Sequence, residues 1–173
     1  EKEPIYNLLF RMITQSSNFS TNLVVDRIGV KNASQTMRSI CAKDIQALRG
    51  VEDNKAYELG MNNTVTAYDL MIIFGHLAKG TVVNKKACDS MIRILMHQQL
   101  REKIPAKLPS DVKVANKTGS IDKISHDSGI VFLPDGRKYV VVLLSAGVED
   151  ENSVNATLAN VSRIIYNHFV NNK

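Results

Sequence analysis

The fold of this chain is decided by residues 112–145, whose sequence is VKVANKTGSIDKISHDSGIVFLPDGRKYVVVLLS. Apolar residues recur here with a period of two, which is typical of strands that bury one face. We predict strands at Val112–Gly119, Ser128–Leu133 and Lys138–Ser145, with Pro134-Asp135-Gly136 as a hairpin turn between the last two. Strands that follow one another through short turns pair antiparallel, so the stretch predicts an antiparallel meander.

The segments on either side of these strands show helical periodicity, with apolar residues three or four positions apart. We expect several helices before the strands, beginning with one at about 5–15, and one helix after them. The N-cap side chains expected for the later helices are Ser20, Asn32, Thr66, Asn84 and Asn152. Helices, then strands, then a covering helix indicate an α+β fold. We divide the chain into a mainly helical portion, residues 1–108, and a C-terminal portion of strands and final helix, residues 109–173.

The composition excludes several classes of protein. The chain is 44% hydrophobic and 23% charged, which is ordinary for a globular protein, and no run approaches the roughly 18 apolar residues of a membrane span. Residues 79–117 contain nine Lys or Arg against three acids, but no aromatic residue for base stacking, so nucleic-acid binding is not expected. Cys41 and Cys88 lack the spacing of zinc ligands, and we predict both to be buried free thiols.

Two short motifs carry side chains suited to catalysis. Ser16-Ser17-Asn18 lies between the first two predicted helices, and Lys117-Thr118-Gly119-Ser120 ends the first predicted strand. The strand motif presents an ammonium and a hydroxyl group, while its glycine lets a substrate backbone approach closely. The helix-junction motif offers a hydroxyl for proton relay and an amide that can orient a carbonyl.

With their flanking residues, these motifs make the chain resemble the class A β-lactamases and related penicillin-recognising serine hydrolases. Residues 12–29 are similar to the Ser-Asp-Asn region of those enzymes, and residues 117–131 to their Lys-Thr-Gly strand and the next strand. The resemblance runs from about Ile5 to Phe169. It implies a β-lactamase/transpeptidase-like fold, a helical domain beside an antiparallel sheet flanked by helices, which is incomplete in this chain. Ser17 stands where class A enzymes usually have Asp, a departure that favours the penicillin-binding peptidases.

The same resemblance implies a role for each motif residue. Ser16 would pass a proton toward the leaving nitrogen of a lactam, and Lys117 would tune Ser16 and attract the substrate carboxylate. The residues that would bind the substrate are Asn18, Thr118, Gly119 and Ser120. No metal and no organic cofactor is implied.

The nucleophile of this family lies in a Ser-x-x-Lys motif upstream of Ser-x-Asn, and we do not find a suitable one here. Two such strings occur, Ser110–Lys113 and Ser120–Lys123, but both lie in strand-forming segments. There the serine and the lysine point to opposite faces, whereas the chemistry needs both on one helix face. We therefore expect the nucleophile on an N-terminal segment of the same protein outside residues 1–173, and we expect this chain alone to be inactive.

A long loop, about 44–63, has no helical period, and at about 20 residues it suggests a functional role. In class A enzymes a glutamate on the corresponding loop activates the deacylating water. Glu52, which follows Asn18 by 34 residues, resembles it best in spacing. The usual Glu-Pro-x-x-Asn pattern is absent, because Asp53 replaces the proline and Ala56 replaces the asparagine. Either Glu52 is this base or it is a solvated acid of the loop.

The leading functional hypothesis is therefore hydrolysis of β-lactam rings through an acyl-enzyme, in the bacterial periplasm or outside the cell. The near alternative is a D-alanyl-D-alanine peptidase or penicillin-binding hydrolase acting on peptidoglycan peptides. An alternative of another class is a non-catalytic protein whose basic face binds an anionic polymer of the envelope.

Overall fold

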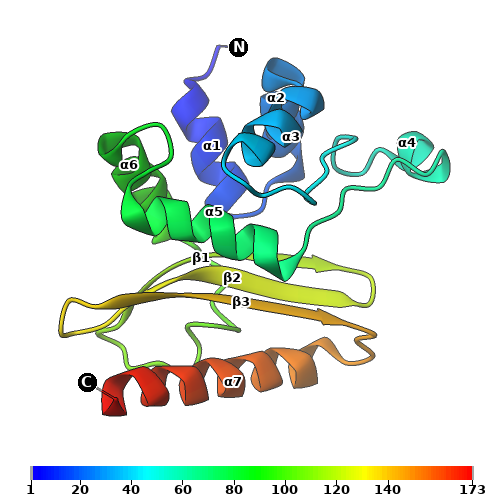
Figure 1. The fold of residues 1–173 in the computed structure, drawn as a ribbon. Helices are drawn as coiled ribbons and strands as arrows, with labels where there is room; N and C mark the ends of the chain where they lie inside the picture. The colour runs from blue at the N-terminus through cyan, green and yellow to red at the C-terminus, as the bar shows by residue number, and fades with distance from the viewer. Residues whose placement is uncertain (1, 173) are drawn as a thin grey trace.

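The computed structural model describes residues 2–172, which form three layers (Figure 1). Helices α1 to α6 make the upper layer, strands β1 to β3 make a sheet in the middle, and α7 lies below the sheet. The helices are α1 (Ile5–Thr14), α2 (Asn18–Ile28), α3 (Val30–Ser39), α4 (Asn54–Glu58), α5 (Ala67–Lys79), α6 (Lys85–Leu95) and α7 (Glu151–Asn171). The strands are β1 (Lys113–Ile121), β2 (Ile124–Phe132) and β3 (Lys138–Ala146). The predicted α+β arrangement is confirmed.

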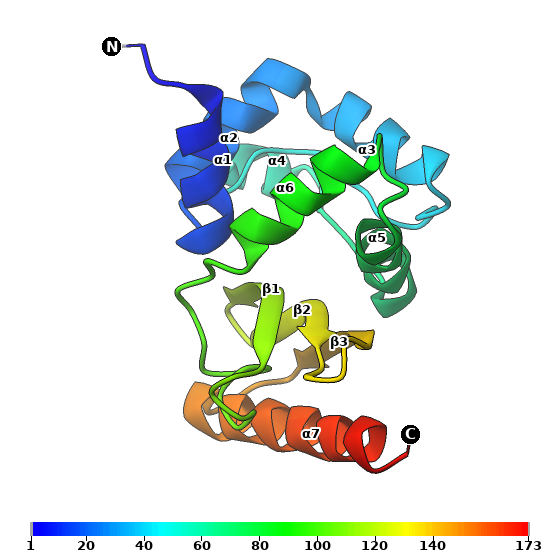
Figure 2. The ribbon, with the colours of Figure 1, turned by 90° about the vertical axis from the view of Figure 1, so that its left-hand side faces the viewer.

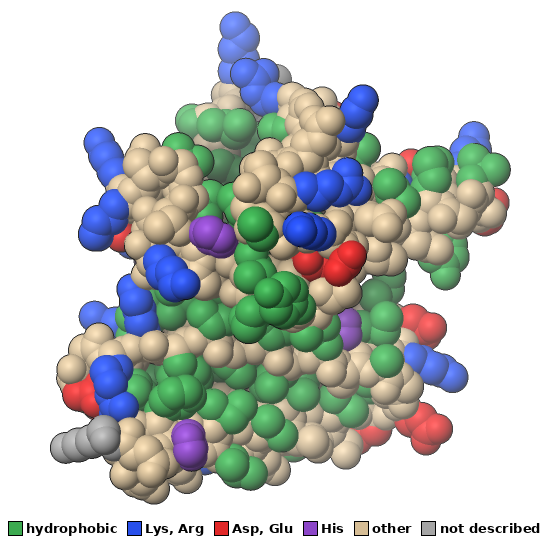
Figure 3. Space-filling view, in the orientation of Figure 1, with side chains coloured by type: hydrophobic (Ala, Val, Ile, Leu, Met, Phe, Trp, Pro, Cys, Tyr) green, Lys and Arg blue, Asp and Glu red, His purple; other side chains and the backbone are tan. Residues whose placement is uncertain are grey.

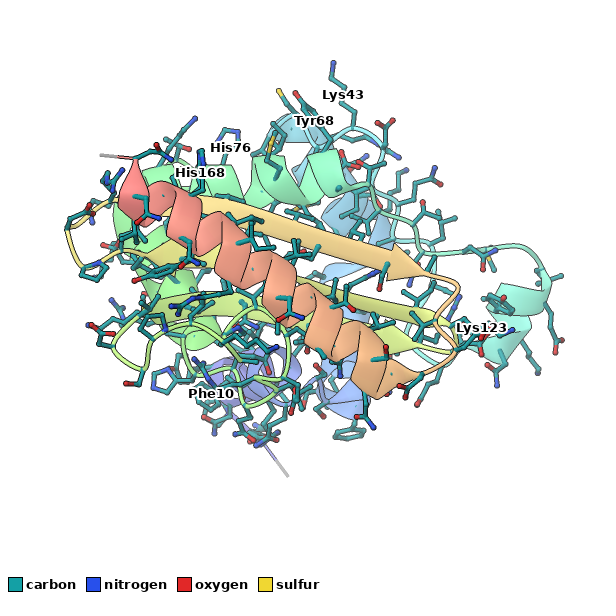
Figure 4. The ribbon with its side chains drawn as sticks, turned by 90° about the horizontal axis from the view of Figure 1, so that it is seen from below. Phe10, Lys43, Tyr68, His76, Lys123 and His168 are labelled. Carbon is teal, nitrogen blue, oxygen red and sulfur yellow. The ribbon has the colours of Figure 1, made fainter. Side chains whose placement is uncertain are left out.

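The sheet is an antiparallel meander in the order β1-β2-β3, and it separates two hydrophobic clusters. Because side chains alternate across a strand, each strand contributes to both clusters. The lower cluster joins Val114, Val131 and Val141 to Tyr166 of α7, which crosses this face of the sheet (Figure 4). The upper cluster contains the buried residues Phe74, Leu77, Cys88, Ile92, Leu95, Ala115 and Ile130. The side view shows the sheet between the two helical layers (Figure 2).

In the pairing of β1 with β2, Gly129 lies opposite Asn116. A β-carbon on Gly129 would lie 2.4 Å from the carbonyl oxygen of Ala115 and 2.8 Å from the Cα of Asn116. Both separations are shorter than van der Waals contact allows, so glycine is required at this position. The close approach fixes the backbone of β1 immediately before Lys117.

Several predicted helix starts are wrong by a few residues. Ser17 caps α2 by accepting a hydrogen bond from the Ser20 backbone N–H, so Ser20 is not the cap and is buried. Asp150, not Asn152, caps α7. In both helices an equally suitable cap residue stands two or three positions earlier, and the chain uses it. The caps Thr66 and Asn84 are confirmed, and Thr66 forms a capping box with Asp69.

The third helix also begins earlier than predicted. It starts at Val30, directly after Gly29, whose φ of +79° turns the chain between α2 and α3. Asn32 therefore lies inside α3, where its side chain donates to the Ile28 carbonyl. The prediction that Cys41 is buried is wrong: it follows α3 with a φ of +71° and is exposed, whereas Cys88 is buried as predicted.

The long loop is confirmed, but it contains the short helix α4, which projects from the body of the molecule (Figure 1). Gln46 and Thr64 pair as an isolated antiparallel bridge, which closes the base of the loop. Strand β2 starts at Ile124, four residues before the predicted start at Ser128, because a tight turn at Asp122 and Lys123 joins it to β1. Within residues 2–172, no helix combines the length and the apolar character that a membrane crossing requires.

Candidate functional site

Ser16 occupies a strained turn between the first two helices. Helix α1 ends at Thr14, α2 begins at Asn18, and Ser16 between them has a φ of +54°, a left-handed conformation uncommon for a residue with a side chain. Strained backbone of this kind is concentrated at functional sites. The half-buried Ser16 side chain contacts Lys117 of β1.

Lys117 of β1 meets Ser16 directly. Its Nζ donates to Ser16 Oγ at 2.5 Å and to the Thr118 carbonyl oxygen at 2.6 Å. The structure thus brings together two residues that are 101 positions apart in the chain. Because the lysine donates to the serine oxygen, the serine hydroxyl hydrogen remains free to be donated elsewhere.

Burial lowers the pKa of Lys117 from its ordinary 10.5 to about 8. The nearby Asp127 carboxylate acts in the opposite direction, and the Lys103 ammonium adds to the lowering. Asp127 is itself fully buried and accepts hydrogen bonds from the Ile104 backbone N–H at 3.0 Å and from the Asn116 amide. Burial raises the pKa of Asp127, and these hydrogen bonds partly offset the effect. Lys117 therefore titrates closer to neutral pH than an exposed lysine does.

A cavity of about 590 Å³ opens beside the Ser16–Lys117 pair. The sequence-predicted residues that line it are Ser16, Asn18, Lys117, Thr118, Gly119 and Ser120. Its floor carries a second ammonium group that the sequence reasoning missed: Lys103 is 3% exposed, and its Nζ donates to Ser120 Oγ at 2.9 Å and to the His126 carbonyl at 3.4 Å. Two ammonium groups, Lys103 and Lys117, and four hydroxyls line this cavity together with the carboxylates of Glu102 and Glu151. The ammonium groups and hydroxyls can hold a substrate carboxylate.

Glu52 comes to the edge of this cavity through the long loop. Asn18 Nδ2 donates to Glu52 Oε1 at 2.8 Å, although Glu52 itself is exposed and has a φ of +63°. Asn22 holds the loop in place, because its side chain accepts from the Val51 N–H at 2.7 Å and donates to the Val51 carbonyl at 2.9 Å. Asn22 was also missed from the sequence, since nothing in its local pattern indicates a contact 29 positions away.

A second, apolar cavity of about 500 Å³ lies on the other side of Lys117, between α1, α5, α6 and the sheet. Its apolar lining is Leu9, Met12, Ile13, Leu70, Ile73, Phe74, Leu77, Met91, Ile94 and Leu95. Strand β3 has no second neighbour within the described chain, and hydrophobic side chains gather along the face where it lies (Figure 3). Tyr68 and Met71 of α5, with Val140 and Val142 of β3, line a further cavity there.

The histidines make local contacts. His76 Nδ1 lies 2.7 Å from Thr81 Oγ1, and His126 Nδ1 accepts the Ser145 N–H at 3.0 Å. Burial lowers the pKa of His126. In the part of the chain that the structure describes, no group of three His, Cys, Asp or Glu side chains could hold a metal ion.

Comparison with known proteins identifies the family. The sequence profile of the Beta-lactamase enzyme family matches residues 2–169. A β-lactamase of Bacteroides uniformis is 36% identical over 73 residues, 37% of this chain and 24% of that protein.

Solved structures show the same fold. A class A β-lactamase of Bacteroides cellulosilyticus DSM 14838 aligns with a TM-score of 0.84 at 23% identity, over 93% of this chain and 62% of its own. PBP-A aligns with a TM-score of 0.89 at 23% identity, over 99% and 63%. A β-lactamase of Chitinophaga pinensis DSM 2588 aligns with a TM-score of 0.87 at 20% identity, over 94% and 64%. The chain thus spans less than two thirds of these relatives. It belongs to the β-lactamase enzyme family and has the β-lactamase-like fold.

Proposed function

We propose that the protein is a class A β-lactamase-like serine hydrolase that opens β-lactam rings through an acyl-enzyme in the periplasm or outside the cell. The observation that carries this proposal is the 2.5 Å contact between Ser16 Oγ and Lys117 Nζ at the mouth of a polar cavity. A hydroxyl that receives a hydrogen bond from an ammonium group, and keeps its own hydrogen free, is suited to deliver a proton.

In the acylation step a serine oxygen attacks the lactam carbonyl and the carbon–nitrogen bond of the ring breaks. The attacking hydroxyl gives its proton to the lysine amine of its own Ser-x-x-Lys motif, and Ser16 delivers a proton to the departing nitrogen. Ser16 then recovers a proton from that lysine, so the protons balance. Lys117 stabilises the negative charge that develops on Ser16 Oγ during this transfer.

The substrate would be held by the remaining groups of the cavity. Asn18 presents its amide to the side-chain carbonyl of the substrate, and Thr118 and Ser120 present hydroxyls to its carboxylate. We add Lys103 to this set, because its buried ammonium group already touches Ser120 Oγ. Charge-assisted hydrogen bonds of this kind are stronger than neutral ones and favour an anionic substrate.

Deacylation needs a base that activates water, and Glu52 is the candidate. Its carboxylate is within hydrogen-bond distance of Asn18, a residue of the cavity wall. Its exposure leaves room for a water molecule but does not hold one as firmly as a buried site would.

The nucleophile, we propose, lies on a helix outside residues 1–173 that seats in the apolar cavity. Neither internal Ser-x-x-Lys string lies on a helix. Ser110 is in the turn before β1 and Lys113 is the first residue of that strand, whereas Ser120 lies in β1 and Lys123 in the β1–β2 turn. The apolar cavity adjoins Lys117 and is lined mainly by apolar side chains. An amphipathic helix with its apolar face inward fits such a lining, and its polar face would reach Ser16.

A peptidase is the second candidate, favoured by two observations. Ser17 occupies the position where class A enzymes usually carry Asp, and Glu52 is exposed on a loop that lacks the usual proline and asparagine. A mutant of PBP-A, whose fold aligns with this chain with a TM-score of 0.89, has been solved as an acyl-enzyme complex with penicillin G. A slow deacylation step would give this protein the same behaviour.

Nitrocefin turnover by the complete protein tests the proposal. Rapid, sustained turnover supports the lactamase, whereas a stable stoichiometric adduct with a fluorescent penicillin supports the peptidase. If the protein shows neither turnover nor an adduct but binds an anionic envelope polymer in a salt-sensitive way, it is a non-catalytic binding protein. Residues 1–173 alone should form no adduct, and mass spectrometry that finds one on a serine of this chain would disprove the assignment of the nucleophile.

A further inference from the structure

Gln98 is a buried polar residue outside the predicted site, and its side chain joins three segments of backbone. It follows α6 on the irregular stretch that leads to β1, and it is 2% exposed. Its Nε2 donates to the Ile13 carbonyl at 2.9 Å and to the Asn116 carbonyl at 3.4 Å, while its Oε1 accepts the Leu100 N–H at 3.0 Å. Every polar atom of the side chain is therefore engaged.

The two carbonyls that Gln98 contacts flank the Ser16–Lys117 pair. Ile13 lies in the last turn of α1, three positions before Ser16, where carbonyls have no helical partner. The N–H of Ser17, which would normally reach Ile13, donates to the Arg11 carbonyl instead. Asn116 is the residue of β1 immediately before Lys117.

A backbone contact beside Gln98 strengthens the same connection. The Gln99 N–H donates to the Thr14 carbonyl at 3.0 Å, so two unpartnered carbonyls at the end of α1 are satisfied by consecutive residues. Helix α1 otherwise packs mainly against α2 and α6 rather than against β1. The position of the Ser16 turn relative to β1 therefore depends on few contacts, and Gln98 supplies one of them.

We propose that Gln98 is a positioning residue that holds the end of α1 against β1 and so keeps Ser16 Oγ within hydrogen-bond distance of Lys117 Nζ. Its catalytic consequence rests on the proposed function, because the pair must deliver a proton in acylation. A displacement of about 1 Å at a reacting group can cost on the order of 10²-fold in rate. The amide acts through the backbone and has no contact with the substrate.

The test compares Gln98→Met with Gln99→Met in the complete protein. Methionine matches glutamine in length but cannot donate or accept these bonds, and the Gln99 side chain is exposed, so Q99M is the matched control. In Q98M we expect water to reach Lys117, so its lowered pKa, followed by NMR of ¹³C-labelled lysine, should rise toward its ordinary 10.5. The acylation rate constant should fall by about 10²-fold, with a change of less than about 3-fold in the dissociation constant of the non-covalent complex. Q99M should match the parent.

A lower melting temperature alone does not support the proposal, since any buried glutamine contributes to stability. A folded Q98M with the Lys117 pKa and acylation rate of Q99M would overturn it. If Q98M does not fold, Gln98→Glu decides: the ionised carboxylate cannot donate, whereas its acid form can donate one bond. The acylation rate of Q98E relative to the parent should then rise as the pH falls, and a constant ratio would refute the positioning role. If the parent itself forms no acyl-enzyme, the proposed function fails, but the Lys117 titration still decides the role of Gln98.

Discussion

The stability of the fold should rise with pH because of Lys117. Burial lowers the pKa of its ammonium group from 10.5 to about 8 in the folded protein, whereas the unfolded chain retains the ordinary value. Between these two values the unfolded state binds more protons at this site, so the free energy of unfolding increases with pH. The gap corresponds to a penalty of about 3 kcal/mol, fully present at neutral pH and lost as the pH rises past the unfolded pKa.

Lys117→Met removes this titration and keeps the length of the side chain. Urea unfolding of the parent and the variant, from about pH 7 to about pH 10.5, isolates Lys117 because all other groups titrate in both proteins. The parent should gain about 3 kcal/mol relative to the variant across this range. Lys113→Met, at the exposed first residue of the same strand, is the control and should show no such gain. A difference between the parent and K117M that stays constant with pH would refute the claim that the ammonium group is buried.

Three further changes test the site and the sheet. Glu52→Gln in the complete protein should leave acylation nearly intact and slow deacylation by about 10²-fold or more, seen as acyl-enzyme that accumulates in mass spectra; unchanged turnover would exclude Glu52 as the base. Gly129→Ala should lose about 1–3 kcal/mol in urea unfolding, because its β-carbon would meet the facing backbone at 2.4 Å. Gly75→Ala, on α5 with open space around it, should gain up to about 1 kcal/mol. Asp127→Ala should lose about 3 kcal/mol, because two buried N–H groups lose their acceptor, whereas the exposed Asp111→Ala should lose little.

The layers of the fold could be predicted because the strands and the helices that pack on them have local signals. The period of two in β1 to β3 and the caps Thr66 and Asn84 depend only on neighbouring residues, and the structure confirms them. The helix starts at Ser20 and Asn152 are wrong because several cap residues stand close together, and only the packing of the helix selects among them. Cys41 is exposed because α3 ends before it, which the apolar pattern of its neighbours did not reveal.

The residues of the site likewise fall into those that the sequence predicted and those that it did not. Ser16 and Lys117 were identified through motifs of the family that the chain resembles. Hydrophobic periodicity could not have shown that these residues, 101 positions apart, are in contact. Lys103 and Gln98 belong to no such motif, and Asn22, although within the region of family resemblance, was given no role. Lys103 and Gln98 lie on irregular backbone, where neither period nor spacing indicates which side chain turns inward. Asn22 lies on α2, but its contacts are with the long loop. Their roles follow only from the folded arrangement.

Lys117 lies between the polar and the apolar cavity. Packing in the apolar cavity can therefore affect the chemistry in the polar cavity. Its side chain lines the polar cavity with Ser16 and also lines the apolar cavity. Because burial is the largest cause that lowers the pKa of Lys117, a helix seated in the apolar cavity would remove further water from the ammonium group and disfavour its charge. A charged Lys117 donates to Ser16 Oγ, whereas the neutral amine can accept the serine hydrogen. A helix that carries the nucleophile, as we propose, would therefore also shift the protonation equilibrium of Lys117, whereas the proposed proton transfer uses its charged form.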